Sequence, residues 1–261
     1  MRIAHRLASL ALVLGASACT TFLEVPVETP IKPKLDVAAF SRVLVAGFVA
    51  GGTEDVDANL ETVRLLRTQL KNKSSLKVID ADVLPLMDAA AKIQGSGPAV
   101  AAGVEAGAAP ADAALPKQIK EEKDLQAFEA LFNNAAYWKK IGEEFGAPLI
   151  VTGTVMFTPQ QRSGYVQKEQ EVYDTFGRRR VVPVRTYMDR KGFILKPKFI
   201  FIDGRTGMPL YAETYREEVL YNAEQSNPAL SSYFELMDRL MPAFLTTLSS
   251  QTIKGTRVLL K

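Results

Sequence analysis

The stretch Arg42–Val49, RVLVAGFV, is a short, continuous apolar run, typical of a strand buried on both faces of a sheet. Asp57 or Asn59 can then cap a helix that extends through Lys71. A second short strand over Leu76–Ile79 completes a β-α-β unit, which the crossover rule makes right-handed and places in one sheet. The apolar face of the helix would consist of Leu60, Val63, Leu66 and Leu70.

Further along the chain, a helix is predicted over residues 121–145, and Gly146 is expected to end it. The apolar stripes of this helix are Leu125, Phe128, Leu131 and Phe132, followed by Tyr137, Trp138, Ile141 and Phe145. Aromatic residues at helical spacing indicate core packing more often than a ligand cage. A third buried strand is predicted over Leu149–Phe157.

The remaining regular elements are two strands over Phe193–Asp203 and Leu210–Val219 and a last helix over Ser231–Leu248, which Pro242 should kink. Together these elements predict an α/β (α+β) fold in which helices pack on a mixed sheet. The last helix, at the C-terminal end, is expected to dock on the domain, because its polar face has few cations for a membrane surface.

The most unusual segment is residues 160–191, which predicts a projecting β-hairpin. Two polar, β-prone arms, Tyr165–Thr175 and Arg179–Met188, flank Phe176-Gly177. The first arm is acidic and the second is basic, so cross-strand charge pairing is one explanation and a partner-binding projection is the other. The candidate partner-binding residues are Tyr173, Phe176, Arg178, Arg179 and Arg180.

Alanine, glycine and proline dominate Asp88–Leu115, where no periodic apolar face exists. So little side chain cannot repay the entropy of ordering, and a flexible insertion over about 88–118 is therefore predicted. The glycines do not form a phosphate loop, because the G-x-x-x-x-G-K-[ST] pattern is absent.

The N-terminal residues 1–18 have a basic start, a short apolar run and small residues, which is the pattern of a cleaved secretory signal. Small residues directly before Cys19 resemble a bacterial lipobox, which implies that Cys19 is acylated and anchors the chain in the outer-membrane lipid. An ordinary signal cleaved after Ala18, leaving a free thiol, is the alternative. Residues 19–38, with three prolines, would form an extended tether, and residues 39–261 a single periplasmic domain.

Charge and residue usage narrow the classes of function. Removing the signal, which contains Arg2 and Arg6, leaves 30 of the 32 basic residues against 29 acidic ones, so no field for nucleic acid is expected. The single histidine, His5, leaves with the signal, and Cys19 is the only cysteine. A mature domain without the usual general base, thiol nucleophile or zinc ligands is predicted to be no enzyme, with no catalytic residue, metal site or cofactor.

The order of these pieces resembles the CsgG/LpoB/TolB-N-terminal group of bacterial envelope proteins. The resemblance lies in the lipobox, the RVLVAGF and LKVID strands, the FGAPLIVTGTV segment and the turn FIDGRTGMPLY, where Asp203, Gly204, Thr206 and Gly207 match the group's pattern. It implies an anticodon-binding-like α/β domain in the periplasm, anchored to the outer membrane. Members of the group include a secretion channel and an activator of a peptidoglycan synthase.

These observations predict a non-enzymatic lipoprotein that binds another envelope protein during assembly, secretion or wall synthesis. The alternative is a subunit of an oligomeric secretion channel, and self-association is left open. Membrane-inserted strands need an apolar face. Neither face of the outgoing arm, residues 165–174, is apolar, which favours the binding protein over the channel.

Overall fold

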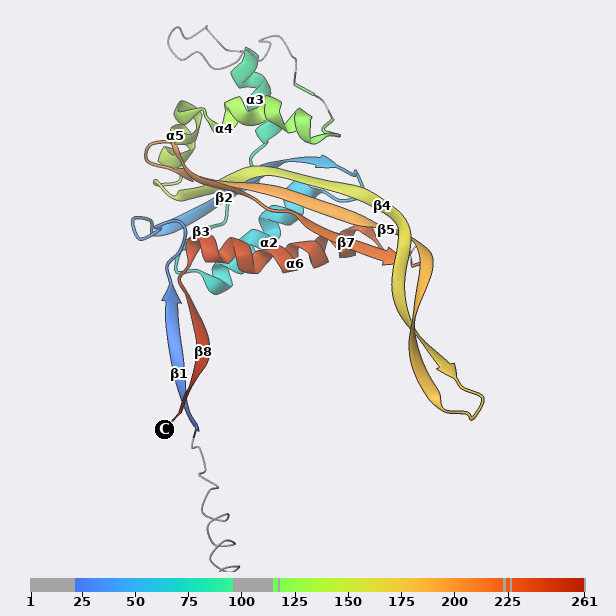
Figure 1. The fold of residues 1–261 in the computed structure, drawn as a ribbon. Helices are drawn as coiled ribbons and strands as arrows, with labels where there is room; N and C mark the ends of the chain where they lie inside the picture. The colour runs from blue at the N-terminus through green and yellow to red at the C-terminus, as the bar shows by residue number, and fades with distance from the viewer. Residues whose placement is uncertain (1–21, 96–114, 117, 223, 226, 261) are drawn as a thin grey trace, which may run out of the picture. The chain divides into compact units, whose positions relative to one another are not determined.

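The computed structural model describes residues 22–95, 115–116, 118–222, 224–225 and 227–260 (Figure 1). The described chain divides into two units: a small one formed by residues 22–33 and 250–260, and a large one, Lys34–Ser249. The predicted signal peptide, Cys19 and residues 96–114 of the predicted insertion lie outside the described residues.

The large unit is built on a mixed sheet with the strand order β3-β2-β4-β5-β6, in which β7 also pairs with β5. Strand β2 is parallel to its neighbours β3 and β4, whereas β5 is antiparallel to β4, β6 and β7. The strands are β2 (Arg42–Gly52), β3 (Lys77–Ile79), β4 (Leu149–Tyr173), β5 (Arg179–Asp203), β6 (Pro209–Thr214) and β7 (Glu217–Asn222).

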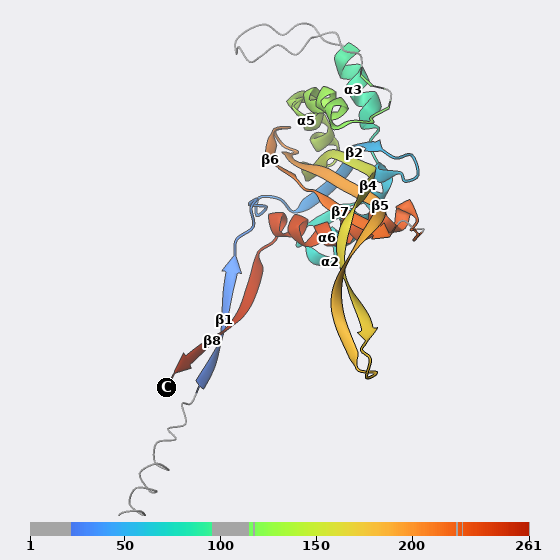
Figure 2. The same cartoon turned by 45° about the vertical axis from the view of Figure 1, so that its right-hand side comes forward.

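Helices cover both faces of this sheet. One face packs against α2 and α6, and the other against α3 and the segments η1, α4 and α5 (Figures 1 and 2). The helices are α2 (Ala58–Lys73), α3 (Leu86–Gly95), the 3-10 helix η1 (Glu122–Phe128), α4 (Glu129–Phe132), α5 (Ala135–Glu144) and α6 (Ala229–Leu248). The predicted fold, a mixed sheet with helices packed on it, is confirmed.

Strand β2 is buried on both faces, as its continuous apolar sequence predicts. Val43 and Val45 belong to the core beneath α2 and α6, and Leu44 and Ala46 to the core beneath α3 and α5. Alternate side chains of one strand therefore serve two separate cores.

Helix α2 begins as predicted, with the Asp57 carboxylate accepting a hydrogen bond of 3.0 Å from the backbone N–H of Leu60. Val63, Leu66 and Leu70 are fully buried. Leu60 is not part of the core face, because 49% of its surface is exposed.

The predicted single helix over 121–145 is three short pieces instead. The break comes before α5, where the Asn134 side chain accepts a hydrogen bond from the backbone N–H of Tyr137 and caps the new helix. Trp138 is fully buried and its indole N–H donates to the Leu131 carbonyl over 2.9 Å, so the aromatic stripe is core, as expected. Gly146 follows α5 with a φ of 73°, in agreement with its predicted role.

Helix α3 corrects the prediction of a flexible insertion from Asp88 onward. Its residues Leu86 and Ala90 are buried in the second core, so this alanine-rich stretch is ordered by packing. The described part of the predicted insertion is thus helical up to Gly95.

The predicted hairpin is not a separate element. Its arms are the outer halves of β4 and β5, each 25 residues long, which begin or end in the core of the sheet. Strand β2 pairs with β4 only as far as Phe157, and β7 pairs with β5 only as far as Arg190. Beyond Arg162 and its partner Arg190 the two strands pair with each other alone, and we call this two-stranded part, residues 163–189, the hairpin.

The predicted strand Leu210–Val219 is two strands, interrupted at Tyr215. β6 pairs with the inner part of β5 and β7 with the part nearer the hairpin. At the interruption, the Tyr215 backbone N–H donates to the Pro197 carbonyl over 2.9 Å.

In the small unit, half of the predicted tether forms strand β1 (Phe22–Ile31). It pairs antiparallel over its whole length with β8 (Gln251–Leu260), a strand that the sequence analysis does not predict. An ion pair of 3.2 Å between Lys254 and Glu28 joins the two strands.

Candidate protein interface on the hairpin

The tip of the hairpin is an ordered turn built around Asp174. Its carboxylate Oδ1 accepts hydrogen bonds from the backbone N–H groups of Phe176 and Arg178, both of 2.9 Å. Its backbone carbonyl accepts a further bond of 2.9 Å from Gly177, whose φ of 73° suits a glycine. The hydrogen bonds to the carboxylate, first that from the Arg178 backbone and then that from Phe176, hold the pKa of Asp174 below its usual range although partial burial opposes them. The turn is therefore preorganised.

The three candidate arginines are all engaged with acids of the hairpin. Arg178 and Arg180 both lie against the Asp174 carboxylate, with N–O distances of 3.0 and 3.8 Å, and Arg179 pairs with Glu171. The cross-strand charge pairing that the sequence suggested is therefore present. Such exposed pairs contribute little stability, so they leave the arginines available to a partner.

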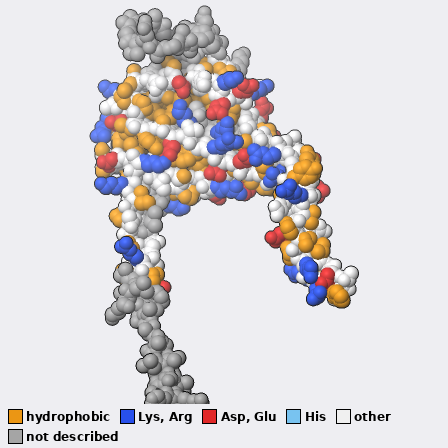
Figure 3. Space-filling model, in the orientation of Figure 1, with side chains coloured by type: hydrophobic (Ala, Val, Ile, Leu, Met, Phe, Trp, Pro, Cys, Tyr) orange, Lys and Arg blue, Asp and Glu red, His pale blue; other side chains and the backbone are white. Residues whose placement is uncertain are grey.

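Large apolar side chains on the hairpin are exposed. Phe176 is 80% exposed and Tyr173 70%, and the Arg178 guanidinium lies 5.3 Å from the centre of the Phe176 ring. Figure 3 shows hydrophobic side chains along the whole projection. Aromatic residues and arginine are the types that most often dominate binding energy at protein interfaces.

The structure brings together all five candidate residues. Each lies within the turn or in the adjacent ends of β4 and β5, and each is exposed. The remaining candidate residue, Cys19, lies outside the described residues.

The register between the arms gives the hairpin two different faces, which the sequence analysis did not find. Tyr165 pairs with Tyr187, and every second pair lies on the same face. We call one the valine face. Its aliphatic residues are Val166, Val172, Val182, Val184 and Met188, and Lys168, Gln170, Arg180 and Thr186 lie among them. We call the other the tyrosine face. It carries Tyr165, Gln167, Tyr173, Val181 and Tyr187, and the charged residues Glu169, Glu171, Arg179, Arg185 and Asp189 lie on it as well. The sequence analysis considered the two faces of the outgoing arm, and the return arm supplies three of the five aliphatic residues of the valine face.

Both outer edges of the hairpin are open. No third strand among the described residues pairs with β4 beyond Phe157 or with β5 beyond Arg190, so unpaired backbone groups point outward along both arms. An open edge of this length is a template for strand addition.

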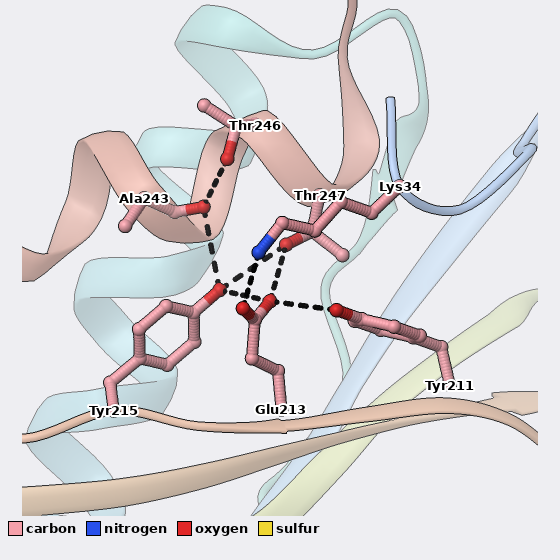
Figure 4. A network of polar contacts seen from close by, with 7 residues as sticks. All are labelled: Lys34, Tyr211, Glu213, Tyr215, Ala243, Thr246 and Thr247. Carbon is pink, nitrogen blue, oxygen red and sulfur yellow. Dashed lines mark hydrogen bonds and ion pairs between the residues drawn. The ribbon is translucent and has the colours of Figure 1, made fainter. Parts of the chain in front are cut away.

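The densest polar network of the large unit lies elsewhere, between β6 and α6 (Figure 4). The Glu213 carboxylate accepts hydrogen bonds from the hydroxyls of Tyr215 (2.7 Å), Tyr211 (3.1 Å) and Thr247 (3.3 Å), and it forms an ion pair with Lys34. Burial acts to raise the pKa of Glu213, but the hydrogen bonds from Lys34, Tyr215 and Tyr211 outweigh it, and its pKa lies below the ordinary value. Burial also raises the pKa of Tyr215. The Glu213 carboxylate therefore holds Lys34, at the start of the large unit, to β6 and α6.

Among the described residues, no cluster of three or more acidic, histidine or cysteine side chains is arranged to hold a metal ion. No helix of the described chain has the length and apolar character needed to cross a membrane.

The sequence matches no known protein family, and no curated protein is similar to it. Solved structures similar to the chain include a lipoprotein from Neisseria meningitidis, with 12% identity, a TM-score of 0.32, and coverage of 78% of this chain and 97% of that one. Another is a putative neuraminyllactose-binding hemagglutinin homolog from Helicobacter pylori, with 8% identity, a TM-score of 0.37, and coverage of 84% and 88%. Scores this low carry no argument about function, which has to come from the residues of this chain.

Proposed function

We propose that this protein is a non-enzymatic binding protein of the bacterial envelope that holds another envelope protein through its hairpin. The observation that carries the proposal is the pair of exposed aromatic side chains, Tyr173 and Phe176, at a turn that Asp174 keeps ordered. A preordered turn loses little entropy on binding, and the aromatic rings supply large apolar area at its end.

The proposed location is the periplasmic side of the outer membrane, with acyl chains on Cys19 as the anchor. The signal pattern of residues 1–18 and the small residues before Cys19 support it. Several acyl chains give stable anchoring where a single one is marginal. The proposal of no catalytic activity is supported by the sequence after the signal, which contains no histidine and no other cysteine.

The partner would meet the hairpin in two ways. Phe176 and Tyr173 would enter a pocket of the partner, while a strand of the partner adds to an open edge and gains main-chain hydrogen bonds. Pro183 lies in β5 and has no N–H group, so the edge of β4, which has no proline between Gln160 and Tyr173, offers the more regular template.

Site-specific photocrosslinking in cells tests this proposal. A photoreactive residue is placed at Phe176, and a matched one at Leu230, an exposed aliphatic residue of α6. We expect a discrete heterologous adduct from position 176, absent at 230 and weakened by Tyr173→Ala. Equal adducts from both positions, or none from position 176, would contradict the proposal.

A second candidate function, a subunit of an oligomeric channel, is favoured by the two faces and edges of the hairpin. The valine face offers five aliphatic side chains, and Glu169 and Arg185, on opposite arms, have no ion-pair partner among the described residues. In a head-to-tail assembly the edge of one copy would carry Glu169 to Arg185 of the next, and such contacts form a ring where the rotation between copies closes. This candidate predicts a ring in detergent and ion conductance in a planar bilayer. A monomer without conductance would exclude it.

A further inference from the structure

At the base of the hairpin, on the side of the sheet that α6 covers, lies a cavity of about 240 Å³. Four amide residues and two aromatic residues line it: Gln160, Gln161, Gln225, Asn227, Phe193 and Tyr221. The register places Gln161 and Lys191 on the face of Phe193 and Gln160 on the opposite face. Lys191 is the only charged residue of the wall. This composition suits an occupant that offers both hydrogen-bond donors and acceptors and little charge, because each amide can donate and accept.

The two rings of the wall are held in place by the core. Phe193 stacks on Phe157, with ring centres 4.8 Å apart and planes inclined by 17°. The Tyr221 hydroxyl donates to the Glu235 carboxylate over 2.6 Å. Both rings are therefore fixed surfaces before any ligand arrives.

The cavity continues into the tyrosine face of the hairpin. Gln161 pairs with Lys191, and two rows further out Tyr165 pairs with Tyr187, so all four side chains lie on one face. The two tyrosine rings meet edge to face, with centres 5.3 Å apart and planes at 78°, and they are 75% and 57% exposed. The pair Ser163–Asp189 lies between these two rows on the same face, so a hydroxyl and a carboxylate separate the cavity from the two rings.

We propose that this surface, from the cavity to the Tyr165–Tyr187 pair, binds a polysaccharide of N-acetylated sugars. The apolar C–H face of a sugar ring packs on an aromatic ring, and its hydroxyl and acetamide groups pair with amides that donate and accept. Lys191 and Asp189, one cation and one anion, leave the surface without net charge, which matches an uncharged sugar chain. The surface is separate from the aromatic tip, so the proposal does not depend on the protein partner.

A proline-rich peptide is the competing occupant of an aromatic surface. Such peptides dock in grooves lined with aromatic side chains. The Tyr165 and Tyr187 rings are nearly perpendicular, so they do not form the two parallel walls that would clasp a proline ring. The four amides favour the sugar further, since proline supplies no N–H donor to pair with them.

The test is a calorimetric titration of the full chain in detergent with chitotetraose, a tetramer of N-acetylglucosamine. Maltotetraose, which has the same length without acetamide groups, and decaproline are titrated in parallel. We expect saturable binding of chitotetraose only.

Two variants on the proposed surface and two control variants locate the binding. Gln161→Ala and Tyr187→Ala remove an amide and a ring from the proposed surface. Gln170→Ala and Met188→Ala are their matched controls, on the same strands but on the opposite face. We expect the first two to raise the Kd about tenfold, equivalent to about 1.4 kcal/mol, and the controls to change it by less than about twofold. Circular dichroism verifies that each variant is folded.

Absence of chitotetraose binding would overturn the proposal, as would a preference for decaproline. Equal binding of maltotetraose would overturn the assignment to N-acetylated sugars. A loss of affinity in the control variants as large as in Gln161→Ala would show that the surface is wrong.

Discussion

Glu213 links segments that are far apart in the sequence, and its protonation should therefore lower the free energy of unfolding. Its pKa is lowered in the folded protein, so its contribution is fully present above its unfolded pKa and is lost as the pH falls through the folded one. Glu213→Gln should cost about 2 kcal/mol at neutral pH, the range of hydrogen bonds to a charged group. It should also reduce the loss of stability that the native protein shows on acidification below pH 4.5.

Thermal melts between neutral and acidic pH measure this difference. Glu129→Gln is the matched control, because Glu129 forms only an exposed ion pair with Lys198. If the Glu213→Gln and Glu129→Gln variants showed the same acid dependence, the network around Glu213 would not be the stabilising element described above.

Asp57 gives a second test at the residue scale. Asp57→Ala removes the side-chain acceptor for the Leu60 N–H group at the start of α2, and it should cost about 1 kcal/mol in urea unfolding. Asp57→Asn keeps an acceptor and should cost much less. A larger loss in Asp57→Asn than in Asp57→Ala would contradict the capping role.

Single residues could be predicted from the sequence where their partners are local. Asp57 and Gly146 act within a few residues, and their types announce a helix start and a helix end. Lys34 and Glu213 are 179 positions apart in the sequence, and their ion pair joins the start of the large unit to β6. No local pattern therefore indicates it. Leu60 has the helical spacing to Val63 but lies beside the buried face of α2, which begins at Ala58 and Thr62.

Among the elements, the hairpin should be separable from the fold. Residues 163–189 pair only with each other, so replacing them by a two-residue turn should shift the melting temperature by only about 2–4 °C, the effect of roughly 1 kcal/mol in a domain of this size. Circular dichroism melts of the deletion variant measure this. Unfolding of the variant at ambient temperature would mean that the hairpin belongs to the core.

The faces of the hairpin could not be read from either arm alone, since a face combines residues of both strands. The valine face has two aliphatic residues on β4 and three on β5, and only the register set by the pairing of Tyr165 with Tyr187 aligns them. The charges of the arms and the turn at Phe176-Gly177 were visible in the sequence, and so the five tip residues could be named. Helix α3 was not predicted because alanine gives little contrast between apolar and polar positions, although alanine is the best helix former.

At the scale of the molecule, the small unit should depend on the end of the chain. Deleting residues 251–261 removes the only strand that pairs with β1 in the described chain. A lone strand leaves its backbone groups to water, so residues 22–31 should exchange their amide hydrogens without protection. The melting temperature of the large unit, Lys34–Ser249, should stay the same.

Hydrogen exchange read by mass spectrometry separates the two outcomes. Protection of residues 22–31 that survives the deletion would show that β8 is not their partner. A fall in the melting temperature of the large unit would show that the two units are coupled.

The class of fold followed from composition and period, because a buried apolar run, an amphipathic helix and a second run specify a sheet with helices on it. The division into two units could not be predicted in this way. Strands β1 and β8 carry prolines, glycine and mixed polar residues without a clear alternation, and what makes each a strand is its partner at the other end of the chain.

The pairing of β1 with β8 also sets the order in which the two units can form. Phe22 is matched with Leu260, which is made long after it. The small unit therefore cannot close until β8 has been made or threaded, whereas Lys34–Ser249 contains all of its own strand partners. A chain cut short before Gln251, by a stalled ribosome or a protease, would present an unpaired β1.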